Sequence, residues 1–443
     1  MKIIGIQSLK NPRKYFEEMT IDVTSHPRDP LDYYVKVNPQ ITYQTHIGFG
    51  GAFTESAAYT WSHLPKDKQQ QIIDAYFSPS GLGYTMGRTH INSSDFSLGH
   101  YTYVKDMDIK LQSFDISRED LYVVPMIQAA MKYVPHIKLL ASPWSPPAWM
   151  KTNNKMSHGG KLKKEYQELW AIYYTKYLEQ MKQRGIPFYA ISVQNEPAAV
   201  QTWDSCIYTA EEERDFVKNA LGPIVHTYDA NLKIIGWDHN RDLIVDRAKT
   251  LLEDPLCAKH MYGIGNHWYV SEAFENLSKV KAMFPDTHLF FTEGCIEGGP
   301  KPGAWETGAR YAKNLIGDLS NGVEGWIEWN LLLNEEGGPN HVGNYCDAPI
   351  LANRKTHELT FNSSYYAIGH FSKFIKEGAK RIHVTHQLPK GLLTVGYQNP
   401  DGSIISILLN ETYENHKISY AIEDEFVSID VPSSSIISLI TSI

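Results

Sequence analysis

Cysteine is scarce in this sequence. The 443 residues contain four, Cys206, Cys257, Cys295 and Cys346, and none forms a C-x-x-C pair. A disulfide framework and a structural zinc site both need clustered cysteines, so neither is expected to organise the fold. Unpaired thiols are typical of a reducing compartment. Because residues 1–19 also lack the long apolar run of a secretory signal, the sequence predicts a cytoplasmic protein.

Excess positive charge and long apolar runs are missing as well. The 42 Lys and Arg against 50 Asp and Glu give a formal net charge of −8, whereas domains that bind nucleic acids usually carry a basic field. No run approaches the roughly 18 apolar residues that a membrane helix needs. We therefore expect neither a nucleic-acid partner nor a membrane span, and the oligomeric state is left open.

Motifs of several enzyme classes are absent. The sequence has no H-E-x-x-H zinc motif, no Walker-type loop and no G-x-S-x-G nucleophile elbow. Its 18 histidines show no ligand spacing, and we interpret His267 as a hydrogen-bonding residue rather than a metal ligand. The sequence thus predicts neither a metal nor a cofactor.

Aromatic residues, in contrast, are abundant. They make up 12% of the chain and include 27 Tyr and 10 Trp. One interpretation is a large and well-packed core. The other is a cleft in which flat rings stack on the apolar faces of sugars. The places where the tryptophans fall along the chain decide between the two.

Eight short apolar runs, followed by polar or aromatic residues and then by helix-like segments, indicate buried strands. They are Gly48–Phe53, Leu82–Ile91, Ile137–Trp144, Phe188–Asn195, Lys233–Asp238, Gly263–Tyr269, His288–Glu293 and Gly322–Leu332. Helical patterns between them include 66–77, 165–183, 209–225 and 304–319.

This alternation predicts an α/β fold, a (β/α)8 TIM barrel. A doubly wound sheet is the alternative, but Gly48-Phe49-Gly50-Gly51 resembles its phosphate-binding turn only weakly.

The two ends of the chain differ from the middle because they lack helical patterns. Strand-like runs near the C-terminus are Leu392–Gln398, Ser403–Leu409, Lys417–Ile422, Phe426–Val431 and Ile436–Ile443. They predict a small antiparallel β-sandwich, which the N-terminal strands join because chain termini often lie close together. The predicted division is 1–45 for the N-terminal sandwich strands, 46–377 for the barrel and 378–443 for the C-terminal sandwich.

Two glutamates stand at the ends of predicted barrel strands. The fourth strand ends in Gln194-Asn195-Glu196-Pro197 and the seventh in Thr292-Glu293-Gly294. Active sites of barrels lie at the C-terminal ends of the strands, and these two strands face each other across the barrel. Retaining glycosidases use such a pair: one carboxyl protonates the leaving oxygen, and the other, about 5–5.5 Å away, attacks the anomeric carbon. The alternative for Glu196 is a surface residue at a helix start.

An acid of this kind needs an elevated pKa. Burial beside apolar rings and a negative neighbour are expected to raise it. Arg88, near the end of the second strand, could pair with a carboxylate and hold it ionised. Among the tryptophans near this rim, Trp144, Trp268, Trp326 and Trp329, we expect Trp326 in the core and Trp329 in the site.

Longer motifs carry a family resemblance. They are Gly48–Glu55 (GFGGAFTE), Tyr76–Tyr84 (YFSPSGLGY), Asp95–Ser97 (DFS), Leu140–Trp144 (LASPW), Asn195–Pro197 (NEP), His267–Tyr269 (HWY), Gly325–Asn340 (GWIEWNLLLNEEGGPN) and Gly369–Ile375 (GHFSKFI). On these segments the sequence resembles glycoside hydrolase family thirty, and within it the glucosylceramidase (acid β-glucosidase) branch. The resemblance is strong over about residues 45–380. Two departures from that branch are His90, where it carries Pro, and His341, where it carries Trp.

The resemblance implies roles for individual residues. Glu196 would be the acid/base and Glu293 the nucleophile. Arg88, His267 and Tyr269 would support the nucleophile side. The residues implied to bind the glycone are Asp95, Trp144, Asn195, Trp329 and Asn344. His267 and Tyr269 are also counted among the substrate-binding candidates.

The resemblance also implies an activity. It is that of a retaining exo-β-glycosidase acting on small β-glucosides through a covalent glycosyl-enzyme. A β-xylosidase, a β-fucosidase or an endo-β-1,6-glucanase of the same fold remains an alternative. A carbohydrate-binding pseudoenzyme is the alternative outside enzymes, although a binder has no need of both carboxylates.

Overall fold

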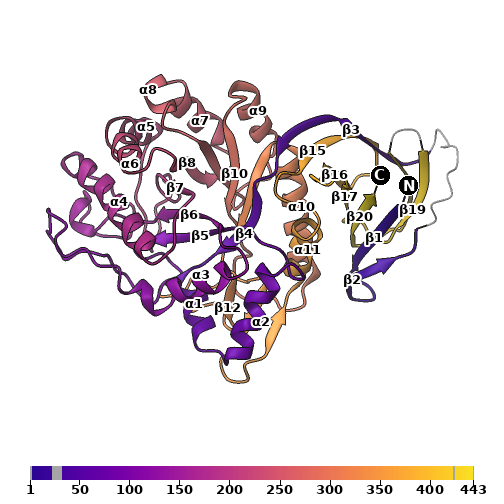
Figure 1. The fold of residues 1–443 in the computed structure, drawn as a ribbon, viewed down its shortest axis with the longest axis horizontal. Helices are drawn as coiled ribbons and strands as arrows, with labels where there is room; N and C mark the ends of the chain where they lie inside the picture. Colours follow the sequence, from indigo (N-terminus) through magenta and orange to yellow (C-terminus); the bar gives the residue numbers. More distant parts are fainter. Residues whose placement is uncertain (1, 22–31, 423–424, 443) are drawn as a thin grey trace.

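The computed structural model describes residues 2–21, 32–422 and 425–442. A barrel and a large β-sheet lie side by side, and both chain ends lie in the sheet (Figure 1). Three sequence-based assignments reach beyond the described residues. The predicted N-terminal strand region contains residues 1 and 22–31, which lie outside the described part of the chain. The same holds for residues 423–424 of the predicted C-terminal domain and for Ile443, the end of the last predicted strand.

Eight parallel strands close into a barrel, in the order β10-β11-β4-β5-β6-β7-β8-β9. Their bounds are β4 Gly48–Ala52, β5 Met86–Ile91, β6 Lys138–Pro143, β7 Ala190–Ser192, β8 Lys233–Asn240, β9 Gly263–His267, β10 His288–Glu293 and β11 Val323–Glu328. Each overlaps one predicted run. Because β11 pairs with β4, the sheet closes and the predicted TIM barrel is confirmed, whereas the open doubly wound sheet is wrong.

Helices cover the outside of the barrel. They are α1 Glu55–Ser62, α2 Lys66–Phe77, α3 Val123–Met131, α4 Gln167–Gln183, α5 Ala210–Phe216, α6 Gly222–Tyr228, α7 Ile244–Leu252, α8 Pro255–Ala258, α9 Glu275–Met283, α10 Trp305–Ser320 and α11 Ser363–Ser372. Local sequence determines where several of these helices begin. α2 starts directly after Pro65, and α5 starts at a capping box in which the Thr209 and Glu212 side chains each bond the other's backbone.

The barrel interior is filled by one apolar side chain from each of six strands: Met86, Leu140, Ala190, Ile235, Phe290 and Ile327. Strand β4 contributes glycines instead. A Cβ on Gly50 would stand 2.2 Å from the Met86 carbonyl oxygen, so only glycine permits this close approach of β4 to β5. The filled interior leaves the strand ends as the place for a site.

The second part is a nine-stranded sheet from both chain ends, in the order β19-β18-β3-β15-β16-β17-β20-β1-β2. Its strands are β1 Lys2–Leu9, β2 Lys14–Met19, β3 Tyr34–Thr45, β15 Lys380–Gln387, β16 Leu392–Gln398, β17 Ile404–Asn410, β18 His416–Ile422, β19 Glu425–Val431 and β20 Ser435–Ser442. The N-terminal β1 pairs along its whole length with the C-terminal β20. All pairs are antiparallel except β3 with β18, which run parallel.

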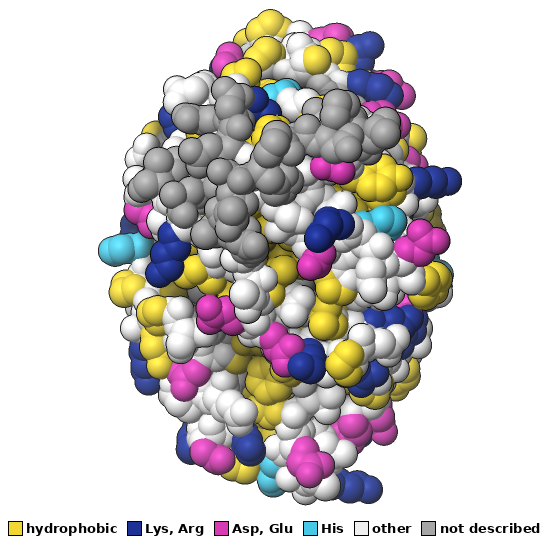
Figure 2. All heavy atoms as spheres, turned by 90° about the vertical axis from the view of Figure 1, so that its right-hand side faces the viewer, with side chains coloured by type: hydrophobic (Ala, Val, Ile, Leu, Met, Phe, Trp, Pro, Cys, Tyr) yellow, Lys and Arg dark blue, Asp and Glu magenta, His cyan; other side chains and the backbone are white. Residues whose placement is uncertain are grey.

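Short elements complete the chain. The strands β12 Leu332–Asn334, β13 Ile350–Ala352 and β14 Leu359–Phe361 form a small sheet beyond β11, and single turns of helix occupy 119–121, 148–150 and 164–166. The helices α10 and α11 lie between the barrel and the nine-stranded sheet (Figure 1). On the sheet's end of the molecule, positive and negative side chains are interspersed (Figure 2). Among the described residues, no helix is long and apolar enough to cross a membrane.

Candidate active site

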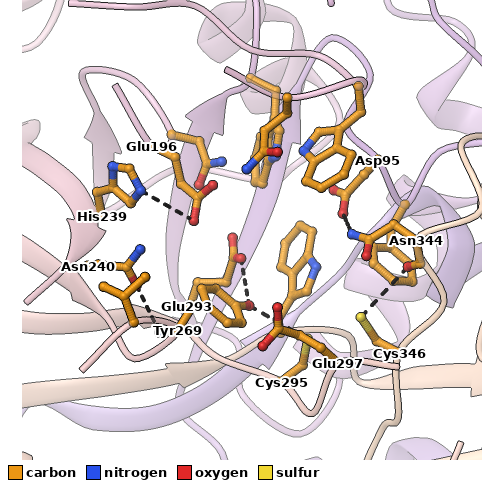
Figure 3. Close-up of a pocket in the computed structure, with 17 residues that line it drawn as sticks. Asp95, Glu196, His239, Asn240, Tyr269, Glu293, Cys295, Glu297, Asn344 and Cys346 are labelled. Atoms are coloured by element: carbon orange, nitrogen blue, oxygen red, sulfur yellow. Dashed lines mark hydrogen bonds and ion pairs between the residues drawn. The ribbon is translucent and has the colours of Figure 1, made fainter. Parts of the chain in front are cut away.

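A cavity of about 260 Å3 lies at the C-terminal ends of the barrel strands (Figure 3). It is lined by Asp95, Phe96, Trp144, Asn195, Glu196, Gln201, Trp203, His239, Asn240, Tyr269, Val270, Glu293, Cys295, Glu297, Trp329, Asn344 and Cys346. Eight of the ten predicted site residues are among them. The other two, Arg88 and His267, lie fully buried behind the wall and contact the two glutamates.

The carboxyl groups of Glu196 and Glu293 face each other in this cavity. An oxygen of each lies within 4.8 Å of an oxygen of the other. This distance agrees with the short separation between the two catalytic carboxyl groups of retaining glycosidases. Glu196 has a φ of 49°, in the left-handed region where a non-glycine residue costs about 1–3 kcal/mol. Glu196 stands four residues after the end of β7, and this backbone conformation sets the direction of its side chain.

Arg88 is the centre of the charge network. Its guanidinium donates to Glu293 Oε2 at 2.7 Å, to Asp238 Oδ2 at 2.8 Å and to Asn195 Oδ1 at 2.9 Å. The phenol of Tyr269 donates to the other oxygen of Glu293 at 2.8 Å. Both oxygens of Glu293 therefore receive a hydrogen bond, which fixes the orientation of this carboxylate.

His267 bridges two carboxylates. Its Nδ1 lies 3.2 Å from Glu196 Oε1, and its Nε2 lies 3.0 Å from Asp238 Oδ1. Burial opposes protonation of this ring, but the carboxylates of Glu293, Asp238 and Glu196 outweigh burial and raise the pKa of His267 to about 9. His267 is therefore a cation that hydrogen-bonds with Glu196 rather than with Glu293.

The two glutamates differ in their pKa shifts. Burial raises the pKa of Glu293, and the charges of His267 and Arg88 only partly oppose that rise. Burial acts on Glu196 in the same direction, but His239 and His267 outweigh it and lower the pKa of Glu196. The rise expected for Glu196 is thus wrong for the ligand-free site, because the proton near Glu196 resides on His267, one hydrogen bond away.

Aromatic and polar groups form one side of the cavity. Trp144 stacks on Trp329 with ring centroids 5.1 Å apart, and Asn344 Nδ2 donates to Asp95 Oδ2 at 2.9 Å. In Figure 3, Asp95 and Asn344 lie on one side of the glutamates and His239 and Asn240 on the other.

The remaining rim tryptophans pack elsewhere. Trp326 stacks on Phe291 at 4.3 Å, and Trp268 packs against both rings. Trp326 is fully buried and Trp268 nearly so. Trp326 therefore lies in the core, whereas Trp329 lines the cavity, and its role in binding stays a prediction.

The main residue missed from the sequence is Asp238. It is fully buried between Arg88 and His267, and the Arg88 charge and the His267 and Ser192 hydrogen bonds overcome burial and lower its pKa. Trp237 and Asp238 both have positive φ, where the pairing of β8 with β9 shifts register. This bulge turns Asp238 inward. The predicted run ended at Asp238, so the strand-end rule already contained the signal.

Two groups of side chains in the described part of the chain could offer three donors to a metal ion. In the first, Glu196, His267 and Glu293, the donor atoms lie within 4.8 Å of one another. Both ring nitrogens of His267 already meet carboxylates, and Arg88 contacts Glu293, so these donors have partners among the residues themselves. The second group is His100, Asp204 and His341, which belong to loops that also carry the cavity-lining Asp95, Trp203 and Asn344.

Taken together, the closed barrel and the paired carboxylates at its strand ends define a retaining glycoside hydrolase. Sequence comparison agrees, because residues 46–375 match the glycosyl hydrolase family 30 TIM-barrel domain and residues 378–439 match the family 30 beta sandwich domain. The chain belongs to glycosyl hydrolase family 30 and is an O-glycosyl hydrolase.

Individual relatives are similar over most of their length. Lysosomal acid glucosylceramidase of Mus musculus is 34% identical, with 90% of this chain and 81% of that protein covered. Putative glucosylceramidase 4 of Caenorhabditis elegans is 37% identical, with 85% of this chain and 76% of that protein covered. The crystal structure of SrfJ from Salmonella typhimurium superposes with a TM-score of 0.96 at 36% identity, covering 100% of each chain.

Proposed function

We propose that this protein is an exo-acting β-glucosidase of the glucosylceramidase type, with Glu293 as nucleophile and Glu196 as acid/base. The observation that carries the proposal is the carboxylate pair, whose oxygens lie within 4.8 Å in a cavity at the barrel's strand ends. Arg88 and Tyr269 hold both oxygens of Glu293 and so orient it for attack.

The proposed reaction has two displacements. In the first, Glu293 attacks the anomeric carbon, the bond from that carbon to the leaving oxygen breaks, and Glu196 gives its proton to that oxygen. In the second, water attacks the glycosyl-enzyme, Glu196 takes a proton from the water, and Glu293 leaves. Because Glu196 is ionised in the ligand-free site, His267 is the proposed donor of the proton that Glu196 delivers, across their 3.2 Å contact. The proton that Glu196 takes from water in the second displacement returns to His267 and restores the resting site.

The proposed glycone contacts lie beside this pair. Asn195 turns Oδ1 toward Arg88, which leaves its amide group to donate to the sugar 2-hydroxyl, a contact that strengthens at the transition state. Asp95 and Asn344 are proposed to bond the more distant hydroxyls, and the rings of Trp144 and Trp329 to bound the sugar's apolar face.

Glucose as glycone and a glucosylceramide as natural substrate are supported by the names of the mouse and nematode relatives. An endo-β-1,6-glucanase is the second candidate. A solved endo-β1,6-glucanase superposes with a TM-score of 0.89 at 28% identity over 99% of each chain, and an endo-1,6-β-D-glucanase of Neurospora crassa is 27% identical over 83% of this chain.

For the compartment we propose the cytoplasm, because all four cysteines are buried free thiols; cell fractionation with an antibody tests this.

The test is a panel of p-nitrophenyl β-glycosides (glucoside, xyloside, fucoside, galactoside) together with β-1,6-linked glucan, and product stereochemistry by NMR. The proposal predicts the highest kcat/KM on the glucoside, with retention. Faster cleavage of the glucan within its chain would favour the second candidate. Hydrolysis of any aryl glycoside rules out a pseudoenzyme.

Glu196→Ala should keep activity on substrates with good leaving groups and be rescued by azide, whereas exposed Glu275→Gln should match the parent protein. Failure of both the residual activity and the rescue would contradict the role of Glu196.

A further inference from the structure

Three side chains meet from three separate loops, each of which also contributes a residue to the lining of the cavity. His100 follows β5, Asp204 follows β7, and His341 lies between β12 and β13. One nitrogen of each histidine and one oxygen of the aspartate lie within 4.8 Å of one another. His100 Nδ1 is 3.1 Å from Asp204 Oδ1, and His341 Nε2 is 3.8 Å from Asp204 Oδ2.

Two buried atoms in this group lack hydrogen-bond partners among the described residues. They are Asp204 Oδ2, on a side chain with 0% exposure, and His341 Nε2. His341 Nδ1 lies 2.9 Å from the Ser97 carbonyl oxygen, which can only accept, so Nδ1 carries the hydrogen. His341 Nε2 then faces the unpartnered Asp204 Oδ2 at 3.8 Å. A buried carboxylate oxygen without a partner is unfavourable, and a metal ion held between it and the ring nitrogens would satisfy both groups.

The geometry also suits a metal ion. In a tetrahedral zinc site with bonds of about 2.0–2.1 Å, neighbouring nitrogen and oxygen donors lie about 3.3 Å apart. The observed separations are near this spacing but involve different carboxylate oxygens: 3.1 Å from His100 Nδ1 to Asp204 Oδ1 and 3.8 Å from His341 Nε2 to Asp204 Oδ2. A ligating histidine usually donates its other ring N–H to a backbone carbonyl, as His341 does to Ser97. The Ser93 hydroxyl donates to Asp204 Oδ1 at 2.9 Å and fixes the carboxylate.

We propose that His100, Asp204 and His341 form a zinc-binding site, separate from the catalytic pair. Two imidazoles and one carboxylate favour zinc or a related transition ion over calcium or magnesium, which prefer oxygen donors. The His100 side chain is 44% exposed, so solvent water reaches the fourth position.

This site joins three loops of the catalytic cleft. Asp95, Trp203 and Asn344, which line the cavity, belong to the same three loops as His100, Asp204 and His341. A bound ion would cross-link the loops and hold this wall of the cleft in place. The site is therefore structural, and its existence does not depend on which glycoside the enzyme cleaves.

The test uses the full-length protein, stripped with EDTA and titrated with ZnCl2 by calorimetry, with Co2+ as a spectroscopic probe. We expect one Zn2+ per chain, a visible band of four-coordinate Co2+, and a higher Tm with Zn2+. His100→Ala and His341→Ala each remove a ligand and should weaken binding by about 100-fold or more, since loss of an outer-shell partner already costs about 10–100-fold.

The matched control is His136→Ala, an exposed histidine that precedes β6 at the opposite end of the barrel; it should bind like the parent protein. Because His100 is partly exposed, its variant is expected to fold, and circular dichroism checks this. Absence of Zn2+ binding at micromolar concentration, or unchanged affinity in both the His100 and His341 variants, would overturn the proposal and leave only a His100–Asp204 ion pair.

Discussion

The charge on His267 makes a quantitative prediction about stability. The surrounding carboxylates raise the pKa of this buried ring from its usual 6.5 to about 9. At about 1.36 kcal/mol for each pH unit, the protonated ring stabilises the folded state by about 3 kcal/mol. This contribution is complete below pH 6.5, where the unfolded chain is protonated too. It is lost as the pH rises from 6.5 through 9, because the folded protein then releases a proton that the unfolded chain has already lost.

The assay is urea denaturation of the parent protein and His267→Gln at a series of pH values from 6 to 9.5. The free energy of unfolding of the parent should fall by about 3 kcal/mol more than that of the variant over this range. Exposed His136→Gln is the matched control and should keep the full slope of the parent. Parallel pH curves for the parent and His267→Gln would refute the reasoning, because His267 would then be neutral in the folded protein.

Four further substitutions test the charge network of the site and the packing of the core separately. Arg88→Met should lower the free energy of unfolding by about 3–5 kcal/mol, because it leaves buried carboxylates without their cation; a loss below 1 kcal/mol would contradict this. Tyr269→Phe removes the bond to Glu293, so kcat on an aryl β-glucoside should fall roughly 10–100-fold, at about 1.5–3 kcal/mol for a bond to a charged group, while Tm changes little. Trp326→Ala should cost about 3–5 kcal/mol of stability in urea denaturation, whereas Trp329→Ala should mainly raise KM; the reverse pattern would show that the two rings were assigned wrongly.

The sequence predicts the position of a site residue correctly where that residue ends a single barrel strand. The runs ending at Trp144, Asn195 and Glu293 place their last residues at the cavity, because buried parallel strands are continuous apolar runs. The helix expected at 66–77 has those bounds in the structure. The parallel pairing of β3 with β18 was not foreseen, because register between distant strands leaves no local trace. The domain limits at 45 and 377 and the residue roles stay predictions.

Contacts between side chains of different strands and loops could not be predicted from the sequence. Asp238 reaches Arg88 through a bulge with two positive-φ residues, which no turn residue announces. The family resemblance implies that His267 supports the nucleophile, yet its hydrogen bond goes to Glu196, because the partner depends on side-chain direction rather than on strand order. In the sequence His341 stands out only as a departure from the family, and its proximity to Asp204 depends on how two loops fold against each other.

The central claim is that Glu293 attacks the sugar. Incubation with an activated 2-deoxy-2-fluoro-β-glucoside, followed by peptide mass spectrometry, tests it most directly, because the fluorine slows breakdown of the glycosyl-enzyme and leaves the attacking residue labelled. The account predicts one adduct per chain, on Glu293, and none in Glu293→Gln. An adduct on any other residue, or hydrolysis of the ordinary glucoside with inversion, would contradict it.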